Sequence, residues 1–399
     1  MNKKNQILII LFLNLVLLSQ SLHAQSQWAA QTSGTTKDLY GCYFFDAQTG
    51  WIVGAGGTIL KTTNGGNTWS SVSTTITSAL YAVFFYDASN GWICGYAGKI
   101  LRTSDGGATW SPQSLGIISS GILKDVFFTS ASTGYIAGTY GVYKTTDGGS
   151  TWTLSHTSNS SQINAVRFKD AANGWSVGLN GKIRVTSDGG ASWTQVNTSS
   201  SDDYYDMCFA GNKTFVVGFK AEVLSSTNNG SSFSSLSTVS DIHAIRFLDN
   251  NTGWFCGSSG KIYFSNDAGN TWIQSNSGSS KLLKDVFFIS ANTGWCIGYG
   301  GTILKYQGSQ VTAIANLNKK SKKQYVYLTE NEIVREADEN STPYKVSIYS
   351  SSGMLLLQNE LSTETSGMSI NALSNGMYVY VVEVENETVE VRKFFRSTL

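Results

Sequence analysis

Three aspartates occupy equivalent positions in a sequence that repeats about every forty residues. In the seven copies of the repeat this position holds Gly41, Ala82, Asp125, Ala165, Asp206, Ala244 and Asp285. Carboxylates that approach each other could supply the two carboxyl groups of a glycoside hydrolase. They could equally pair with nearby cations, because charged groups inside proteins are normally paired.

Two arginines and one histidine interrupt the repeat beside these aspartates. Arg167 and Arg246 stand two positions after the small-or-acidic residue, where other copies have an aromatic residue or cysteine, and His243 stands one position before it. The symmetry of the repeat does not require these groups, so they are candidates for function. Two interpretations stay open: the charges line a watery channel as ion pairs, or they form part of a ligand surface at the channel mouth.

Tyr96, Tyr140 and Tyr299 are candidates for the same ligand surface. Each falls on a glycine-flanked turn between the second and third strands expected in its copy. In a ring of such copies these turns share one face with the start of the innermost strands. Aromatic rings there could stack on sugars or anchor a protein partner, while the polar groups set the orientation.

Other kinds of site find little support in the composition. After the first 24 residues only His156 and His243 remain, too few for a histidine-rich zinc site and unpromising for a Ser-His-Asp triad. The formal net charge of +1 gives no electrostatic footprint for nucleic acid. We expect no catalytic residue, no metal and no other cofactor.

The repeat itself predicts the elements that position these residues. An aromatic residue, usually in a Gly-Trp pair, opens the second strand of each copy with successive spacings of 41, 43, 40, 40, 39 and 41 residues. That period fits the blade of a β-propeller. Alternating apolar runs punctuated by glycine dominate, and helical periodicity is almost absent, so the predicted fold class is all-β.

A turn motif such as TSDGGATW recurs in six copies. Its aspartate can accept hydrogen bonds from turn N–H groups and its glycines permit positive φ, so we interpret the motif as structural. The seventh copy lacks the motif, but Trp28 precedes the first apolar run as the motif tryptophans precede later ones. We therefore predict that residues 25–310 form a seven-bladed propeller whose N-terminal strand closes the last blade, so that only short, protected sheet edges remain.

These motifs carry a resemblance to a known family. The turn motifs match the Asp-box, or bacterial neuraminidase, repeat, and with GWxxG and GxIxxT in the blades, residues 28–307 resemble the photosystem II stability/assembly factor family of seven-bladed propellers. The resemblance implies the fold and a general scaffold role. Asp boxes also occur in sialidases and xyloglucanases, so they do not identify an activity.

The N-terminus reads as an export signal. Residues 1–24 contain Lys3 and Lys4, a run of 12 apolar-rich residues and a small-residue cleavage site before Gln25. This run is short for a bilayer span, and we expect no transmembrane segment after signal removal.

The repeat ends before Gly308, and the composition of the chain changes after it. Residues 311–324 carry four lysines and read as a basic, solvated linker. Residues 325–399 alternate as a small β-domain, with VSIY, LSNGMYVY and a basic ending, and resemble the C-terminal type A sorting domain of the Bacteroidetes type IX secretion system. That resemblance implies a β-sandwich-like domain, recognition by the secretion machinery, and release from the cell or attachment to its outer surface.

Five cysteines, Cys42, Cys94, Cys208, Cys256 and Cys296, all fall on expected strands without CxxC spacing. They read as buried thiols, although a bridge between neighbouring blades stays open. Taken together, these observations predict a secreted or cell-surface propeller that binds a glycan or protein at its channel mouth without catalysis. The alternative is a secreted glycan hydrolase, sialidase- or xyloglucanase-like, that uses the channel-mouth carboxylates.

Overall fold

The computed structural model describes residues 28–306 except 114–120, 159–160, 199 and 239–240. In the C-terminal part it describes residues 326–328, 332–335, 344–350, 355–362, 367–370, 373, 376–384 and 387–396. The predicted signal peptide, residues 1–24, and the predicted linker, residues 311–324, lie outside the described residues. The chain divides into two compact units, residues 1–309 and 310–399, each with its own sheets.

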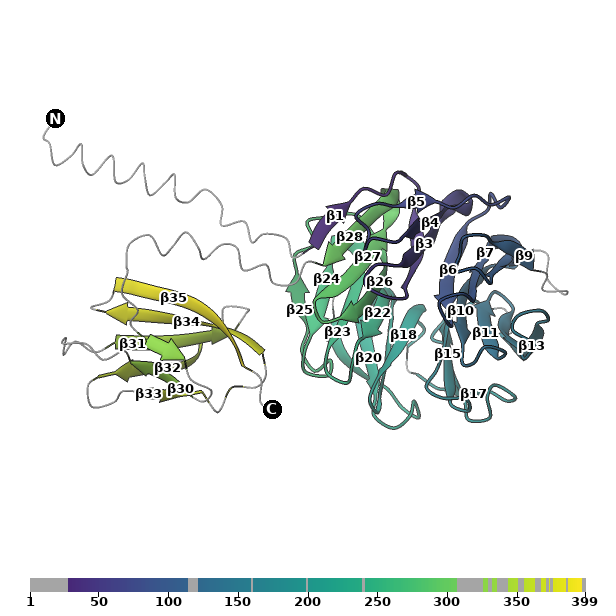
Figure 1. The fold of residues 1–399 in the computed structure, drawn as a ribbon. Helices are drawn as coiled ribbons and strands as arrows, with labels where there is room; N and C mark the ends of the chain where they lie inside the picture. Colours follow the sequence, from purple (N-terminus) through teal and green to yellow (C-terminus); the bar gives the residue numbers. More distant parts are fainter. Residues whose placement is uncertain are drawn as a thin grey trace, which may run out of the picture. The chain divides into compact units, whose positions relative to one another are not determined.

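The first unit consists of seven four-stranded antiparallel sheets arranged as the blades of a propeller (Figure 1). The innermost strands are β2 (Leu39–Phe44), β6 (Leu80–Phe85), β10 (Leu123–Phe128), β14 (Ile163–Phe168), β18 (Tyr204–Ala210), β22 (Ile242–Phe247) and β26 (Leu283–Ser290). The second strands are β3 (Gly50–Gly54), β7 (Gly91–Gly95), β11 (Gly134–Gly138), β15 (Gly174–Gly178), β19 (Lys213–Gly218), β23 (Gly253–Gly257) and β27 (Thr293–Gly298).

The outer half of each blade continues the same up-and-down order. The third strands are β4 (Ile59–Thr62), β8 (Ile100–Thr103), β12 (Gly141–Thr145), β16 (Ile183–Thr186), β20 (Glu222–Ser226), β24 (Ile262–Ser265) and β28 (Thr302–Tyr306). The outermost strands are β5 (Ser70–Ser71), β9 (Ser111–Gln113), β13 (Thr153–Thr157), β17 (Thr194–Val196), β21 (Ser234–Thr238), β25 (Ile273–Ser275) and, from the N-terminus, β1 (Trp28–Gln31). Five turns between second and third strands are short 3-10 helices, η1 (Ala55–Gly57), η2 (Tyr96–Gly98), η3 (Phe219–Ala221), η4 (Ser258–Gly260) and η5 (Tyr299–Gly301).

The N-terminal strand closes the ring as predicted. Strand β1 pairs antiparallel with β28, with Trp28 opposite Tyr306, and these two strands lie side by side in Figure 1. The Trp28 side chain is buried, and its indole N–H donates to Ser275 Oγ in the neighbouring blade (3.0 Å). The last blade therefore combines the two ends of the propeller sequence.

Aromatic pairs join all seven blades to their neighbours. The aromatic residue of each second strand packs on a phenylalanine near the end of the next blade's innermost strand. The pairs are Trp51–Phe85, Trp92–Phe128, Tyr135–Phe168, Trp175–Phe209, Phe215–Phe247, Trp254–Phe288 and Trp295–Phe44, with ring centroids 3.5–4.8 Å apart. Each pair contributes about 0.5–1.5 kcal/mol beyond the area that it buries. The regular Gly-Trp spacing thus reports a contact between blades as well as a strand.

The Asp-box turns are held by their own aspartates. Asp147 Oδ1 accepts hydrogen bonds from the Thr151 N–H (2.9 Å) and the Thr145 hydroxyl (2.8 Å), and its Oδ2 accepts from the Thr151 hydroxyl (2.6 Å). These bonds lower the pKa of Asp147 to about 2. The structural interpretation of the motif is confirmed, because the carboxylate is engaged by the turn that contains it.

The second unit contains two sheets around one core. The first sheet has the order β29 (Val326–Leu328), β30 (Glu332–Arg335), β33 (Gly367–Ser369). The second has the order β32 (Leu355–Leu361), β31 (Tyr344–Ser350), β34 (Gly376–Val384), β35 (Glu387–Arg396). Buried Ile333 and Met368 from the first sheet share a hydrophobic cluster with Val346, Ile348 and Val382 from the second. This is the β-sandwich-like domain that the sequence predicted.

Candidate functional site: the channel mouth

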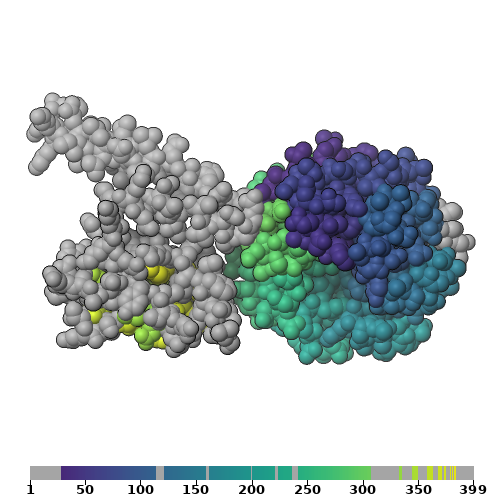
Figure 2. All heavy atoms as spheres, in the orientation of Figure 1, coloured from purple at the N-terminus to yellow at the C-terminus, as the bar shows by residue number. Residues whose placement is uncertain are grey.

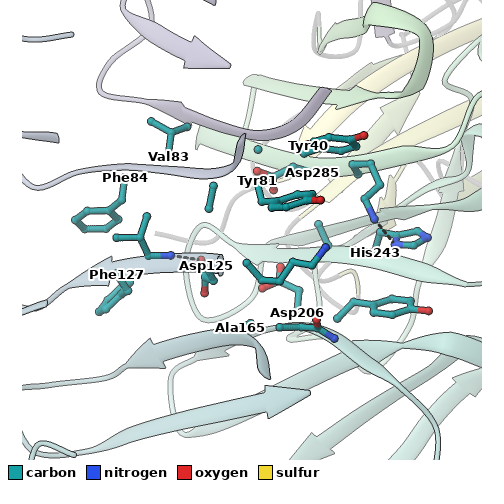
Figure 3. A pocket seen from close by; sticks show the side chains of 18 of the residues that line it. Tyr40, Tyr81, Val83, Phe84, Asp125, Phe127, Ala165, Asp206, His243 and Asp285 are labelled. Carbon is teal, nitrogen blue, oxygen red and sulfur yellow. Dashed lines mark hydrogen bonds between the residues drawn. The ribbon is translucent and has the colours of Figure 1, made fainter. Parts of the chain in front are cut away.

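The innermost strands of all seven blades line one central cavity of about 270 Å³. Figure 2 shows the hollow that the blades surround, and Figure 3 shows part of its lining. Six of the nine predicted site residues line this cavity, namely Asp125, Asp206, Asp285, Arg167, Arg246 and His243. The structure therefore brings these six residues together at one cavity.

A backbone irregularity lies directly before each of the three aspartates. In each innermost strand the pairing with the second strand skips one residue, as between Leu123 and Asp125. Such a bulge interrupts the ladder of backbone hydrogen bonds and leaves N–H groups in need of acceptors. Asp125 Oδ1 accepts a hydrogen bond from the N–H of its neighbour Val126 (3.0 Å). The aspartate thus satisfies a backbone donor close to the bulge.

Each aspartate also reaches the next blade. Asp125 Oδ2 accepts from the Val166 N–H (2.8 Å), and Asp206 Oδ2 accepts from the Ile245 N–H (3.0 Å). Asp285 Oδ2 accepts from the Cys42 N–H (2.9 Å), which connects the last blade to the first. These three inter-blade aspartates therefore join blades three to four, five to six and seven to one.

The residues at the receiving blades are small. Ala165, Ala244 and Gly41 stand where the next blade could have carried its own carboxylate. A Cβ atom at Gly41 would lie 2.6 Å from the carbonyl oxygen of Tyr81, so this position has no room for a side chain. Since seven is odd, acidic and small residues cannot alternate around the whole ring, and blades one and two both carry a small residue.

Arg167 neutralises two of the three aspartates. Its guanidinium forms ion pairs with Asp125 and with Asp206, the latter at 3.4 Å, and all three side chains are largely buried. Burial raises the pKa of Asp125, and the adjacent Arg167 opposes that effect. Asp125 and Asp206 therefore match the ion-pair interpretation of the channel.

Asp285 and Arg246 are arranged differently. Burial raises the pKa of Asp285 to about 6, and nearby Arg246 and the hydrogen bond from Cys42 hold it down. The Arg246 guanidinium lies 5.1 Å from the centroid of the Phe287 ring. Within the described part of the chain, no carboxylate lies within 4 Å of Arg246, so the predicted pairing of this arginine with an aspartate is not formed as a direct salt bridge.

A second layer of side chains surrounds the cavity at the bulged positions, one residue before the aspartates. It consists of Tyr40, Tyr81, Lys124, Asn164, Tyr205, His243 and Lys284. These residues are in register in the repeat, and His243 is the one among them that the sequence marks as a candidate. The signal that could have found the others is the mixture of tyrosine and lysine at a repeat position that has no fixed residue type.

Aromatic rings and ammonium groups pack against each other in this layer. The Tyr40 and Tyr81 ring centroids are 5.3 Å apart, and Lys124 Nζ lies 3.9 Å from the Tyr81 ring centroid. His243 stacks on Tyr205 at 4.8 Å with the two rings nearly parallel. Figure 3 shows Tyr40, Tyr81 and His243 around the opening, with Asp125 and Asp206 lower in the view.

His243 is held as a neutral ring. Lys284 Nζ lies 3.0 Å from His243 Nδ1, the contact drawn as a dashed line in Figure 3. Burial, with the nearby Lys284 charge, lowers the pKa of His243 to about 3, so the ring accepts a hydrogen bond from the ammonium at neutral pH. The pKa of Lys284 is lowered to about 8, mainly by burial and to a smaller extent by the charge of Lys124.

The three predicted turn tyrosines lie outside the cavity lining. Tyr96, Tyr140 and Tyr299 are 49%, 46% and 37% exposed. The ring centroids of Tyr299 and Tyr40 are 6.3 Å apart. The pKa of Tyr81 is raised mainly by burial and to a smaller extent by the nearby Tyr96 and Tyr299 side chains. The structure thus connects Tyr96 and Tyr299 to the cavity layer, while Tyr140 is exposed on the corresponding turn of the third blade.

The five cysteines are buried and free. Cys42, Cys256 and Cys296 gather close to Asp285, where burial and a hydrogen bond with Cys256 raise the pKa of the Cys296 thiol. No bridge joins neighbouring blades, which answers the question that the sequence left open.

Among the described residues, no three His, Cys, Asp or Glu side chains are placed to hold a metal ion. None of the described helices has the length and hydropathy of a membrane span.

Comparison with known proteins agrees with this architecture. The family described as Photosynthesis system II assembly factor YCF48 matches residues 20–116, 67–155, 156–242 and 237–307. The family described as Secretion system C-terminal sorting domain matches residues 322–395. No curated protein matches the chain.

Solved structures show the same fold at low identity. The structure titled "YCF48 bound to D1 peptide" is 22% identical with a TM-score of 0.61, over 70% of this chain and 96% of its own. YCF48 from Cyanidioschyzon merolae is 21% identical with a TM-score of 0.61, over 70% of this chain and 98% of its own. The WD40 propeller domain of Doa1, at 12% identity, has a TM-score of 0.57, over 70% of this chain and 96% of its own.

The two family matches account for both compact units. The sorting domain indicates type IX secretion, so the protein is secreted or displayed at the cell surface. The propeller matches extend across most of the chain and coincide with the seven blades. The chain belongs to the photosynthesis system II assembly factor YCF48 family.

Proposed function

We propose that this protein is a non-catalytic binding module that holds a peptide segment of a protein partner at its channel mouth. The observation that carries the proposal is the combination of a 270 Å³ cavity with an exposed aromatic rim on the same face. That volume lies just below the range of about 300–1,000 Å³ for ligand pockets, which suits one side chain or a chain end. The exposed Tyr96 and Tyr299 rings supply apolar area around the opening.

A glycan ligand has less support than a peptide. Sugar recognition by aromatic residues needs free ring faces, but inside the cavity Tyr205 is stacked on His243 and Lys124 lies over Tyr81. The related structure titled as bound to a D1 peptide also supports peptide recognition by this fold. We propose no photosynthetic partner for this protein, since its sorting domain indicates type IX secretion.

The hydrolase alternative has one supporting observation. Asp285 has a pKa raised to about 6, in the range that suits a general acid. A second, free carboxylate is required for glycoside hydrolysis. Asp125 and Asp206 both pair with Arg167 and accept backbone hydrogen bonds, so they are engaged in holding the blades together.

The proposal is tested with the full-length chain on peptide and glycan arrays, together with fluorogenic glycoside substrates. We expect saturable binding to peptides, no turnover, and weaker binding by the Tyr96→Ala/Tyr299→Ala double variant. The matched control is Phe45→Ala/Tyr86→Ala, which removes two aromatic residues of similar exposure that follow innermost strands β2 and β6 at the opposite face. Turnover that disappears in Asp285→Asn would establish the hydrolase instead, and equal peptide binding by both double variants would show that the chosen face is wrong.

A further inference from the structure

Two ammonium groups at the channel mouth, those of Lys124 and Lys284, form no salt bridge within the described part of the chain. Lys124 and Lys284 line the cavity from blades three and seven, at the bulged position of each innermost strand. Among the described residues, neither ammonium has a carboxylate within 4 Å. Like charges that share a desolvated space repel each other, which is an unfavourable arrangement unless something else offsets it.

The surroundings hold these charges in place without neutralising them. Lys124 lies over the Tyr81 ring, and Lys284 lies 6.0 Å from the Tyr205 ring centroid while it donates to neutral His243. Ring faces and a neutral imidazole stabilise an ammonium but carry no negative charge. Both lysines have a lowered pKa, with burial as the main cause. The site therefore holds two cations in fixed positions, and among the described residues neither forms a salt bridge with a carboxylate.

The charges deeper in the channel offset these two cations only in part, because burial and the charge of Lys124 lower the pKa of Lys284 more than nearby Asp285 raises it. Arg167 already serves Asp125 and Asp206, and Arg246 lies near Asp285. The cavity lining thus carries four cationic side chains, Lys124, Arg167, Arg246 and Lys284, and three carboxylates, with His243 neutral. The surplus positive charge is concentrated in the outer layer, where a ligand would enter.

We infer that Lys124 and Lys284 form a subsite that receives a carboxylate group of the peptide ligand, either its C-terminus or an acidic side chain. Around the ring, Lys284, Tyr40, Tyr81 and Lys124 come from four consecutive blades, so the two cations flank a pair of aromatic rings. A carboxylate between the lysines would relieve their repulsion, and the adjoining apolar part of the peptide would contact the tyrosines. This inference rests on the proposed peptide-binding function and specifies the chemical group that is recognised.

The test separates the subsite from peptide binding as a whole. N-acetylglycine, the smallest peptide-like carboxylate, and its neutral counterpart N-acetylglycinamide are titrated into the full-length chain and followed by NMR. In parallel, a peptide library with free C-termini and acidic side chains is compared with the same library carrying carboxamides throughout. Lys124→Met/Lys284→Met removes both charges, Lys124→Arg/Lys284→Arg retains them, and Lys99→Met is the control for an exposed lysine beside turn η2.

We expect N-acetylglycine to bind and the amide not to bind, and acidic peptides to bind the methionine double variant at least about tenfold more weakly. The arginine variant should retain most of the affinity, and Lys99→Met all of it. Unchanged tryptophan fluorescence and unfolding midpoint in the variants show that they are folded. Equal binding of acid and amide peptides would overturn the carboxylate subsite while leaving peptide binding intact. Lysine-dependent binding of N-acetylglycine without any library peptide would support the subsite and contradict the proposed function. Binding of glucuronate but not N-acetylglycine would overturn the peptide assignment.

Discussion

Replacing Arg167 by methionine is expected to lower the free energy of unfolding of the propeller by about 3–5 kcal/mol at pH 7. The guanidinium is largely buried and is the shared ion-pair partner of Asp125 and Asp206. Its removal leaves two carboxylates facing one desolvated channel. The inter-blade hydrogen bonds from Val166 and Ile245 remain, so the loss is confined to the charge interactions.

The penalty should depend on pH in a defined direction. Burial raises the pKa of Asp125 even beside Arg167, and loss of the guanidinium raises it further. A carboxyl group whose pKa is higher in the folded chain binds a proton on folding, so lowering the pH favours the folded state until it falls below the unfolded pKa of about 4. The difference between wild type and Arg167→Met should therefore be smaller at pH 5 than at pH 7.

Urea unfolding followed by tryptophan fluorescence measures this change in the propeller alone, because all 11 tryptophans lie in that unit. The matched control is Arg102→Met, which removes an arginine that lies over the Trp92 ring and should cost at most about 1 kcal/mol. A loss in Arg167→Met no larger than in this control, or one that grows as the pH falls, would refute the assigned role of Arg167.

Three further predictions concern the rest of the propeller. Asp147→Ala should lower the melting temperature at pH 7. Because the pKa of Asp147 is depressed to about 2, its carboxylate stabilises the folded state fully above the unfolded pKa of about 4. In thermal scans the difference in melting temperature from wild type should therefore shrink below about pH 4 and disappear as the pH falls through about 2. Gly41→Ala should destabilise by about 1–3 kcal/mol in urea because its Cβ would meet the Tyr81 carbonyl, whereas Ala82→Ser, at an intermediate-burial position, serves as a milder comparison. The five cysteines should resist a thiol reagent in the native protein and all react in urea, because they are buried and free; native labelling would contradict their burial.

The blades were predictable because their signals are local and repeated. Gly-Trp marks a strand that is buried on both faces, and the structure shows why the glycine is needed: a side chain at Gly50 would collide with the ring of Phe44. Trp28 indicated how the ring closes. The last blade lacks the motif that precedes an outermost strand, so the N-terminal segment that contains Trp28 must supply that strand. These inferences need only the period and the requirement that sheet edges be paired.

The contacts of the site were less predictable. The alternation of acidic and small residues was visible in the aligned repeat, but the sequence did not show that each aspartate accepts a hydrogen bond from a backbone N–H of the next blade, as Asp125 does from Val166. A sequence does not show which backbone N–H groups of one blade lie within reach of a side chain from the next. It also gave no basis for deciding between Arg167 and Arg246, which occupy equivalent positions, whereas only Arg167 lies between two carboxylates.

The odd number of blades gives the channel mouth its polarity. Inter-blade aspartates occupy alternate blades, so the ring must contain one junction, between blades one and two, where small residues are adjacent. Tyr40 and Tyr81 pack together at this junction, and the lysines come from the two blades that flank it. A ring with perfect sevenfold symmetry would present the same group to a ligand from every side. Here the aspartate-free junction places apolar rings on one side of the opening with a cation at each end, so a ligand that carries both an apolar part and a carboxylate can bind in a single orientation.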